Sequence, residues 1–216
     1  MKIAITGNSS GIGYELDVYI SLTTNHEVRG FSKSNGYNIA TNNGEDVVQA
    51  ILEYDPDVVF NNAYYPKSQN NILARLYDEW KDQNKVIINT GSISGYLKGI
   101  LLHDDSDYVN DKKELAEFCV RNSFNYPWNN KTRIHNVSFG FVDTPLLTNT
   151  NKEINRDNLL TSIDAVEILY GLIEEKSYYV AEQVINCTFD SDDEMFLHFG
   201  VATRNMLKHI ARSNKK

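Results

Sequence analysis

The sequence is poor in the residues that build metal sites and disulfide frameworks. Its two cysteines, Cys119 and Cys187, lie far apart and in no metal-ligand spacing, so we expect free thiols. The five histidines are scattered without a pair at ligand spacing, and we predict no metal site. The formal net charge of −8 leaves no basic surplus for a phosphate backbone. We therefore expect no nucleic acid partner.

Long apolar runs are also absent. No stretch is apolar enough over a sufficient length to cross a membrane, and no signal-peptide pattern precedes the apolar segment at residues 2–6. We expect a cytoplasmic protein with no membrane partner. The chain has 216 residues, a hydrophobic fraction of 41% and only 4 prolines, which is typical of a globular protein that buries a full core. We expect a single domain over residues 1–216.

Short β-branched runs alternate with amphipathic helical patterns along most of the sequence. Several runs are apolar without alternation, as in strands that are covered on both faces. Such an order predicts an α/β fold, with a doubly wound parallel sheet between two helical layers. A further helix is expected at about residues 192–212. The predicted strands are Lys2–Thr6, Glu27–Phe31, 57–61, 85–89, 133–138 and 183–187.

A glycine-rich loop, TGNSSGIG, follows the first predicted strand at residues 6–13 and leads into a helical pattern. In that context Gly7 permits a tight turn, Gly11 lets the backbone approach a pyrophosphate, and Gly13 lets the helix pack close to the strand. Ser9 and Ser10 add hydroxyl donors, and the free N–H groups of the helix N-terminus, beginning near Ile12, favour phosphate. The loop predicts a Rossmann-like dinucleotide site. A purely structural glycine turn is the alternative.

The end of the second predicted strand bears on the choice of nicotinamide cofactor. NAD-binding chains usually carry an acidic residue there, which accepts a hydrogen bond from the ribose 2′-hydroxyl. Here Ser32 takes that place and Lys33 follows, so a 2′-phosphate would meet an ammonium and no carboxylate. The sequence favours NADP(H), while NAD(H) remains possible if Lys33 is only a solvated surface lysine.

A possible redox site lies within residues 88–112. Tyr108 and Lys112 are four residues apart, which places them on one face of a helix. A nearby ammonium is expected to lower the tyrosine pKa from about 10 and suit the phenol for proton transfer. Ser92, at the end of a predicted strand, could hydrogen-bond the same substrate oxygen. Lys112 could also hold the ribose of the cofactor.

Together these motifs resemble the short-chain dehydrogenase/reductase family from residue 1 to about residue 190. TGNSSGIG matches the family's glycine motif, NNAY resembles its N-N-A-G with Tyr64 in place of glycine, INTGSISG resembles its serine strand, and YVNDK its tyrosine–lysine motif. NVSFGFVDTP resembles the family's N-x-x-x-P-G-x-[IV]-x-T, with Phe139 in place of proline. The resemblance implies catalytic roles for Ser92, Tyr108 and Lys112.

The same resemblance implies further site residues. The family has a catalytic asparagine on the helix before the serine strand. Asn71 is the candidate, with Asn70 next, and both could instead merely cap that helix. The implied cofactor contacts outside the loop and the redox site are Ser32, Lys33, Asn38, Ile39, Asn62, Ala63, Val142 and Thr144.

Some features depart from the family pattern. The helix before the serine strand is expected to be short, and Asp104, Asp105 and Asp107 precede Tyr108, where they would raise its pKa unless they face solvent. The substrate lid, at about residues 145–160, is short and polar.

These features predict an NADP(H)-dependent oxidoreductase that interconverts a small-molecule carbonyl and an alcohol. The alternative is a non-catalytic NAD(P)-binding sensor or scaffold on the same fold. An epimerase of the extended type is disfavoured because little chain remains after the last strand. Family members pair through the tyrosine helix, so a homodimer or homotetramer is expected.

Overall fold

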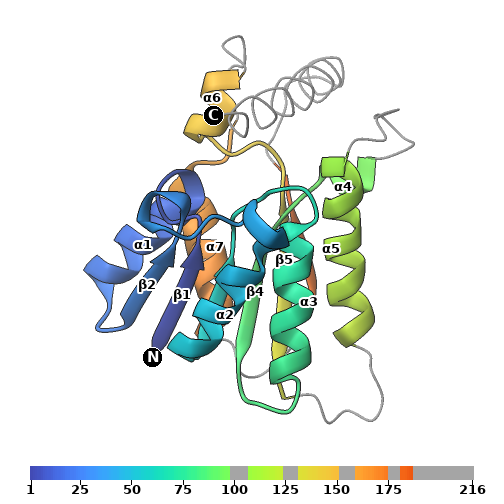
Figure 1. Cartoon of the computed structure of the whole chain (residues 1–216). Coiled ribbons are helices and arrows are strands. Elements are labelled where there is room, and N and C mark those ends of the chain that lie inside the picture. The colour runs from blue at the N-terminus through green and yellow to red at the C-terminus, as the bar shows by residue number, and fades with distance from the viewer. Residues whose placement is uncertain (98–106, 124–130, 151–158, 175–180, 187–216) are drawn as a thin grey trace.

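A central parallel sheet organises the chain. The computed structural model describes residues 1–97, 107–123, 131–150, 159–174 and 181–186 (Figure 1). Within them six strands form one sheet in the order β2-β1-β3-β4-β5-β6, and all neighbouring strands run parallel. The strands are β1 (Lys2–Thr6), β2 (Glu27–Phe31), β3 (Val58–Asn61), β4 (Val86–Ser92), β5 (Arg133–Phe139) and β6 (Glu182–Ile185).

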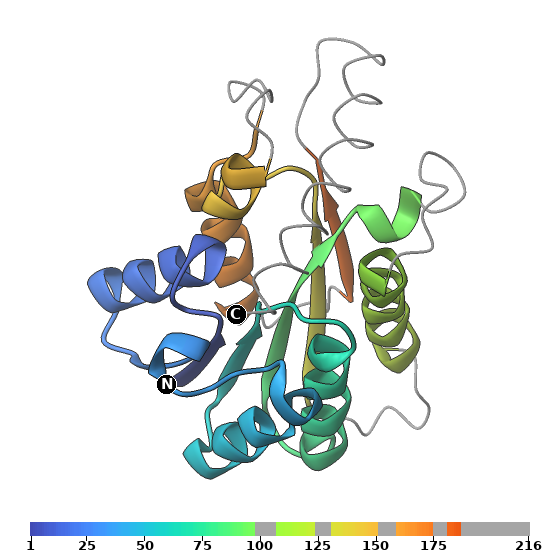
Figure 2. The same cartoon turned by 45° about the horizontal axis from the view of Figure 1, so that its top comes forward.

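Helices cover both faces of this sheet, so the predicted three-layer α/β/α arrangement is confirmed (Figure 1, Figure 2). One face carries α1 (Gly11–Thr23) and α7 (Ser162–Glu174), which pack on Ile3, Ile5 and Phe60. The other face carries α2 (Glu45–Tyr54), α3 (Ser68–Trp80) and α5 (Asp107–Ser123). Short helices complete the described part: η1 (Lys33–Asn35), η2 (Thr41–Gly44), α4 (Ser94–Leu97) and α6 (Pro145–Thr150).

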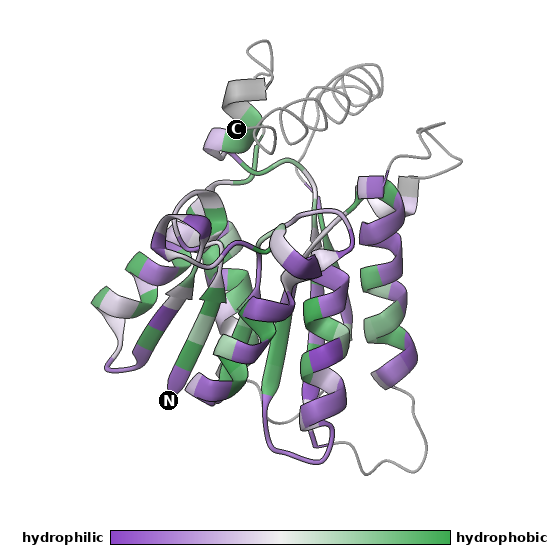
Figure 3. Cartoon of the chain, viewed as in Figure 1, coloured by the Kyte–Doolittle hydropathy of each residue, from purple (hydrophilic) through white to green (hydrophobic). Residues whose placement is uncertain are grey.

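The strand sequences explain why both faces are buried. Successive residues of a strand point to opposite faces, and here both kinds of position are apolar. In β1, Ala4 packs with the α2–α3–α5 layer, whereas its neighbours Ile3 and Ile5 pack with the α1–α7 layer. Figure 3 shows hydrophobic residues along the strands and on parts of the helices that lie next to the sheet.

The order of the strands places a crevice at their carboxyl ends. The chain leaves β1 to form β2 on one side and then crosses to β3 on the other side of β1, so the strand order reverses at β1. In open α/β sheets ligands bind outside the carboxyl ends of the strands at such a switch point. The loop after β1, the segment after β3 and the end of β4 all meet at this edge (Figure 2).

The predicted strands agree closely with the observed ones. β1 and β2 have the predicted bounds, and the strand predicted at 85–89 continues three residues further, to Ser92. That extension pairs Thr90, Gly91 and Ser92 with Val137, Ser138 and Phe139 of β5. The helix expected at 192–212, Cys187 and the 151–158 part of the predicted lid lie outside the described residues.

Candidate active site

The glycine loop is held closely against its neighbours. The Gly7 N–H donates to the Phe31 carbonyl at the end of β2 (2.8 Å), and Gly7 has a φ of 73°, which favours glycine. At Gly13 a Cβ would lie 2.4 Å from the Gly7 oxygen and 2.6 Å from Asn62 Nδ2. Only glycine therefore lets the first turn of α1 pack this close to β1, as the sequence predicts.

Thr6 joins the glycine loop to the NNA segment. Its Oγ1 accepts hydrogen bonds from the backbone N–H groups of Asn62 (2.9 Å) and Ala63 (3.0 Å). The Asn62 amide in turn donates to the Thr6 carbonyl (3.3 Å). Two motifs more than fifty residues apart in the sequence thus form one wall of the crevice.

A cavity of about 430 Å³ occupies this edge of the sheet, a volume in the usual range for small-molecule sites. It brings together every predicted cofactor and catalytic residue except Gly13, which lies buried behind the loop, and Asn71. The predicted residues that line it are Gly7, Ser9, Ser10, Gly11, Ile12, Ser32, Lys33, Asn38, Ile39, Asn62, Ala63, Ser92, Tyr108, Lys112, Val142 and Thr144.

The residues after β2 differ in their availability to a ligand. Ser32 is buried, its backbone N–H donates to Asn35 Oδ1 (2.8 Å), and its hydroxyl lies 2.9 Å from that of Ser34. Lys33 is exposed and lines the cavity. The exposed Lys33 ammonium is therefore available to a ligand at the end of β2, whereas Ser32 mainly stabilises the turn.

The loop after β5 closes the cavity from the other side. Val142 is buried and forms an isolated bridge with Leu160. Thr144 lies beside the glycine loop, because a Cβ at Gly11 would meet its methyl group at 3.7 Å. Both residues therefore stand where a ligand on the glycine loop would reach them.

Ser92 and Tyr108 line the end of the cavity for which the resemblance implies the chemistry, and we call it the reactive end. Ser92 ends β4, Tyr108 is the second residue of α5, and both side chains are buried and line the cavity. The Ser92 hydroxyl donates to Ser94 Oγ (3.1 Å) and accepts from the Ser94 N–H (3.2 Å). Burial raises the pKa of Tyr108, and the nearby Ser92 hydroxyl only partly offsets this rise. This direction is opposite to the lowered pKa that the Tyr108–Lys112 spacing predicts. Asp107 is exposed, and Asp104 and Asp105 lie outside the described residues.

The Lys112 ammonium hydrogen-bonds to groups other than the Tyr108 hydroxyl, and this explains why the pKa of Tyr108 is not lowered. Its Nζ donates to Gln69 Oε1 (2.7 Å) and to the Thr90 carbonyl (2.8 Å), and it lies 5.7 Å from the centre of the Tyr108 ring. Burial lowers the pKa of Lys112 to about 7, opposed by the nearby Asp111 carboxylate. The lysine thus titrates close to neutral pH.

Of three consecutive amides at the start of α3, only Gln69 reaches Lys112. Asn71 donates to the Asn43 carbonyl (3.0 Å) and does not line the cavity. Asn70 donates to the backbone carbonyl of Asp111 (3.0 Å). Sequence reasoning named the two asparagines and missed the glutamine one position earlier.

Tyr64, the residue that replaces the family's glycine, packs against the reactive end. Its ring meets that of Tyr108 edge to face, with centres 4.8 Å apart, and Lys112 Nζ lies 5.3 Å from its centre. Its hydroxyl donates to Asp111 Oδ2 (3.2 Å). The buried Asp111 also accepts from the Lys67 N–H (2.8 Å) and pairs with Lys67 Nζ (3.0 Å). Sequence reasoning did not single out Asp111.

Two further features of the described residues concern metals and membranes. They contain no group of three or more His, Cys, Asp or Glu side chains that could hold a metal ion. None of the helices described here has the length and apolar character needed to span a bilayer.

Comparison with solved structures gives the class of fold. The chain resembles a 3-alpha-hydroxysteroid dehydrogenase from a Pseudomonas species, in complex with NADH, with a TM-score of 0.71 and 19% identity over 86% of this chain and 95% of that one. It also resembles a short chain dehydrogenase from Burkholderia cenocepacia in complex with NADP, with a TM-score of 0.64 and 16% identity over 93% of this chain and 96% of that one.

A third similar structure is the 3-ketoacyl-(acyl-carrier-protein) reductase from Brucella melitensis in complex with NADH, with a TM-score of 0.65 and 18% identity over 86% of this chain and 95% of that one. Scans of the sequence against protein-family models and against curated proteins find no match. The chain thus has the fold of the short-chain dehydrogenases/reductases, and at these identities the likeness establishes the fold alone.

Proposed function

We propose that this chain is an NADP(H)-dependent oxidoreductase of the short-chain dehydrogenase/reductase family, which interconverts a small-molecule carbonyl and an alcohol. The observation that carries the proposal is the placing of Ser92, Tyr108 and Lys112 in the same cavity as the glycine loop. The three residues come from β4 and α5, and the loop comes from the other end of the sequence. Fold alone would not support an activity, but this combination of groups does.

The residues present fit a nicotinamide dinucleotide. The closely packed glycine loop and the N-terminus of α1 would hold its pyrophosphate. Asn62 and Ala63 would border one ribose, Lys112 the other, and Val142 and Thr144 the nicotinamide end. Asn38 and Ile39 would lie at the adenine end. When bound, the cofactor supplies or accepts the hydride.

The side chains at the reactive end would handle the proton. The Ser92 hydroxyl would orient the substrate oxygen, and the Tyr108 phenol would donate a proton to it during carbonyl reduction. Because burial raises the pKa of Tyr108, the phenol keeps this proton until an acceptor arrives. The Lys112 ammonium would stabilise the phenolate that forms.

The choice of NADP(H) over NAD(H) depends on the end of β2. Lys33 is exposed beside the cavity, and the cavity-lining residues after β2 include no carboxylate that would repel a 2′-phosphate. The competing proposal is a sensor or scaffold that binds the dinucleotide without catalysis. It would need the loop and Lys33, but not the Tyr108–Ser92 pair.

Two measurements test these proposals. Titration with NADPH and with NADH, followed by nicotinamide fluorescence, should show tighter binding of NADPH, and Lys33→Glu should reverse the preference. Lys81→Glu, a change at the opposite end of the sheet, serves as the matched control. An unchanged preference in Lys33→Glu would refute the role of Lys33.

A panel of aldehydes and ketones assayed with NADPH should then reveal a reductase activity. Tyr108→Phe should lower this activity by at least about a hundredfold while NADPH binding stays nearly intact. Activity that survives in Tyr108→Phe would refute its role as acid. Binding of NADPH without turnover of any carbonyl or alcohol would favour the sensor or scaffold.

Other properties remain predictions. We infer a single domain over residues 1–216, a homodimer or homotetramer, and a cytoplasmic location. The expected partners are a small-molecule carbonyl or alcohol, and neither nucleic acid nor membrane. Sedimentation of the purified chain measures its oligomeric state directly.

A further inference from the structure

The side chain of Gln69 lies at the centre of the contact between α3, the sheet and α5. It is 1% exposed. Its Nε2 donates to the backbone carbonyls of Asn61 (2.8 Å) and Thr90 (3.1 Å), and its Oε1 accepts from Lys112 Nζ (2.7 Å). The three hydrogen bonds of the amide therefore reach three different elements: β3, β4 and α5.

These partners fix the orientation of the amide. A carbonyl can only accept, so the two backbone carbonyls require the NH2 group of Gln69 on their side. A flipped amide would place two carbonyls against Oε1 and the NH2 group against an ammonium. The oxygen of Gln69 must therefore face Lys112, and two hydrogen bonds on the opposite side hold it there.

Lys112 gains a fixed geometry from this arrangement. An ammonium has three N–H donors, and here two of them point to Gln69 Oε1 and to the Thr90 carbonyl. The rings of Tyr64 and Tyr108 lie 5.3 and 5.7 Å from Nζ, within the range of cation–π contacts. One N–H remains for the cavity, which Lys112 lines.

We propose that Gln69 is the positioning residue of the redox site: its fixed amide oxygen holds the Lys112 ammonium charged and directed at the reactive end of the cavity. This inference rests on the proposed oxidoreductase function. The resemblance implies a catalytic asparagine on this helix, whereas the side chain of the helix that contacts Lys112 is that of Gln69. Because an amide oxygen does not take up a proton at neutral pH, Gln69 orients the lysine without relaying its proton.

The other titratable groups that face Lys112 come from two segments. Tyr108 and Asp111 lie on α5, and Tyr64 lies in the segment after β3. The third element packed against Lys112, β4, contributes the Thr90 carbonyl and the neutral Ser92 hydroxyl. The Asp111 carboxylate also stabilises the Lys112 ammonium. Asp111 must therefore stay unchanged in every Gln69 variant, so that a shift of the Lys112 pKa can be attributed to Gln69.

The first test measures Lys112 itself in the cofactor-free protein. Lysine labelled with 13C and 15N allows its titration to be followed by NMR, and the Lys112 signal is the one missing in Lys112→Met. Gln69→Met keeps the length of the side chain but removes the acceptor, so the Lys112 pKa should fall by about one unit. Gln69→Glu places a carboxylate beside the ammonium, so the pKa should rise by at least about one unit.

The second test follows carbonyl reduction with NADPH as a function of pH. Turnover should fall as Lys112 loses its proton, because the phenolate of Tyr108 then loses its stabilising charge. The midpoint of this fall should move to lower pH in Gln69→Met and to higher pH in Gln69→Glu, by the shifts that NMR measures. Gln49→Met, the same change at an exposed glutamine of α2, is the matched control and should move neither quantity.

The outcomes separate this inference from the proposed function. A Lys112 pKa that is the same in wild type, Gln69→Met and Gln69→Glu would overturn the positioning role, whatever the activity. If Gln69→Met does not fold, Gln69→Glu decides, since it keeps the size of the side chain and the attraction between its charge and the Lys112 ammonium opposes the repulsion from the Asn61 and Thr90 carbonyls. If wild type reduces no carbonyl, the proposed function fails, while the NMR titration still decides whether Gln69 sets the state of Lys112.

Discussion

The burial of Lys112 should leave a measurable mark on stability. The side chain is 4% exposed, and burial lowers its pKa from 10.5 to about 7. In the unfolded chain the lysine is in water and keeps its proton up to about pH 10.4. Between these pH values the unfolded state therefore binds one proton more than the folded state.

The sign and size of the effect follow from proton linkage. Where the unfolded state binds more protons, the free energy of unfolding rises with pH, here by up to about 1.4 kcal/mol per pH unit. Between pH 7.5 and pH 9.5 the gain should be about 2.5 kcal/mol, slightly below the maximum, because folded Lys112 still keeps part of its proton at pH 7.5 and the unfolded lysine begins to lose its own near pH 9.5. Below pH 7 both states are protonated, and this contribution no longer changes with pH.

Urea unfolding of wild type and Lys112→Met at pH 7.5 and pH 9.5 measures the effect. The difference in unfolding free energy, wild type minus variant, should become more favourable to wild type by about 2.5 kcal/mol at the higher pH. Other titrating groups contribute equally to both chains and cancel.

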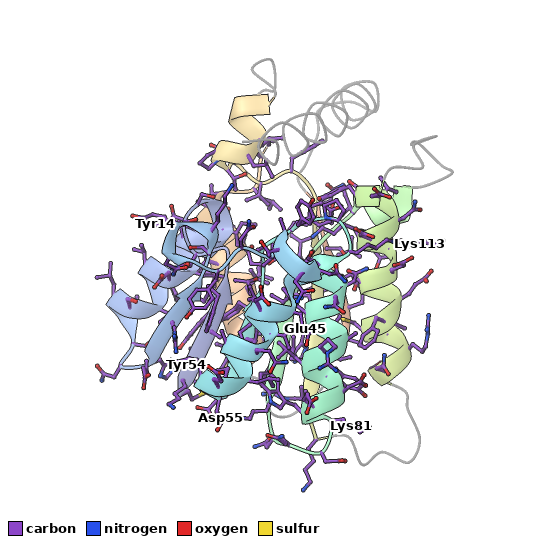
Figure 4. All side chains as sticks on the ribbon, viewed as in Figure 1. Tyr14, Glu45, Tyr54, Asp55, Lys81 and Lys113 are labelled. Carbon is purple, nitrogen blue, oxygen red and sulfur yellow. The ribbon has the colours of Figure 1, made fainter. Side chains whose placement is uncertain are left out.

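Lys113→Met is the matched control for this experiment. Lys113 is the next residue of α5, with 52% of its side chain exposed and an ion pair of 3.8 Å to Glu117, a kind of surface contact that is worth little (Figure 4). Its difference from wild type should stay nearly constant with pH. A difference that is equally constant for Lys112→Met would refute the argument that burial destabilises the ammonium.

Three further changes test individual contacts. Gly13→Ala would bring a Cβ within 2.4 Å of the Gly7 oxygen, so NADPH binding measured by fluorescence should weaken by at least about tenfold; unchanged binding would contradict the packing of the loop. Asp111→Ala leaves the Tyr64 hydroxyl and the Lys67 N–H without their acceptor and should cost about 2–4 kcal/mol in urea unfolding, whereas a loss below about 1 kcal/mol would show that water replaces the carboxylate. Tyr64→Phe keeps the ring and loses one hydrogen bond, so the free energy of unfolding in urea should fall by about 1 kcal/mol. A fall as large as that of Asp111→Ala would show that the Tyr64 hydroxyl carries most of the stability of this contact.

The fold could be predicted because its signals are local. Apolar runs without alternation mark strands covered on both faces, and β1 and β2 end where their sequences turn to glycine or serine. The end of β4 was predicted too early because Thr90, Gly91 and Ser92 are small or polar. They continue the strand since β5 lies beside them and pairs with each one, a partner that the local sequence does not reveal.

The glycine-loop side of the cavity was equally accessible from sequence. Its residues lie in short motifs whose glycines and hydroxyls have a direct geometric reason, as Gly13 and Thr6 show. The support of Lys112 was not accessible, because it depends on which side of α3 faces α5. The rotation of α3 about its axis is set where the helix begins, at Lys67. This residue has a positive φ of 66° and contacts Asp111 through its backbone N–H and its Nζ.

Gln69, Asn70 and Asn71 are consecutive amides. The sequence alone does not show which of them faces α5, because it does not fix the rotation of α3 about its axis. A shift of one residue turns a helical side chain by about 100°. Gln69 therefore points to Lys112, while Asn70 reaches the backbone of α5 and Asn71 the loop before α2. The side chain that contacts Lys112 thus lies on the helix for which the resemblance implies a catalytic asparagine.

The buried groups also bear on the choice between an enzyme and a nucleotide-binding scaffold. A scaffold could use Lys112 to hold a ribose, and the glycine loop with Thr6 to hold the rest of the nucleotide. It would have no use for the Tyr108 phenol, which is buried at the edge of the cavity near Ser92. Burying two hydroxyl groups is costly compared with an apolar core, so a scaffold would gain nothing from keeping both of them here. Proton transfer to a substrate oxygen is a purpose that needs both hydroxyls, and this requirement favours the oxidoreductase.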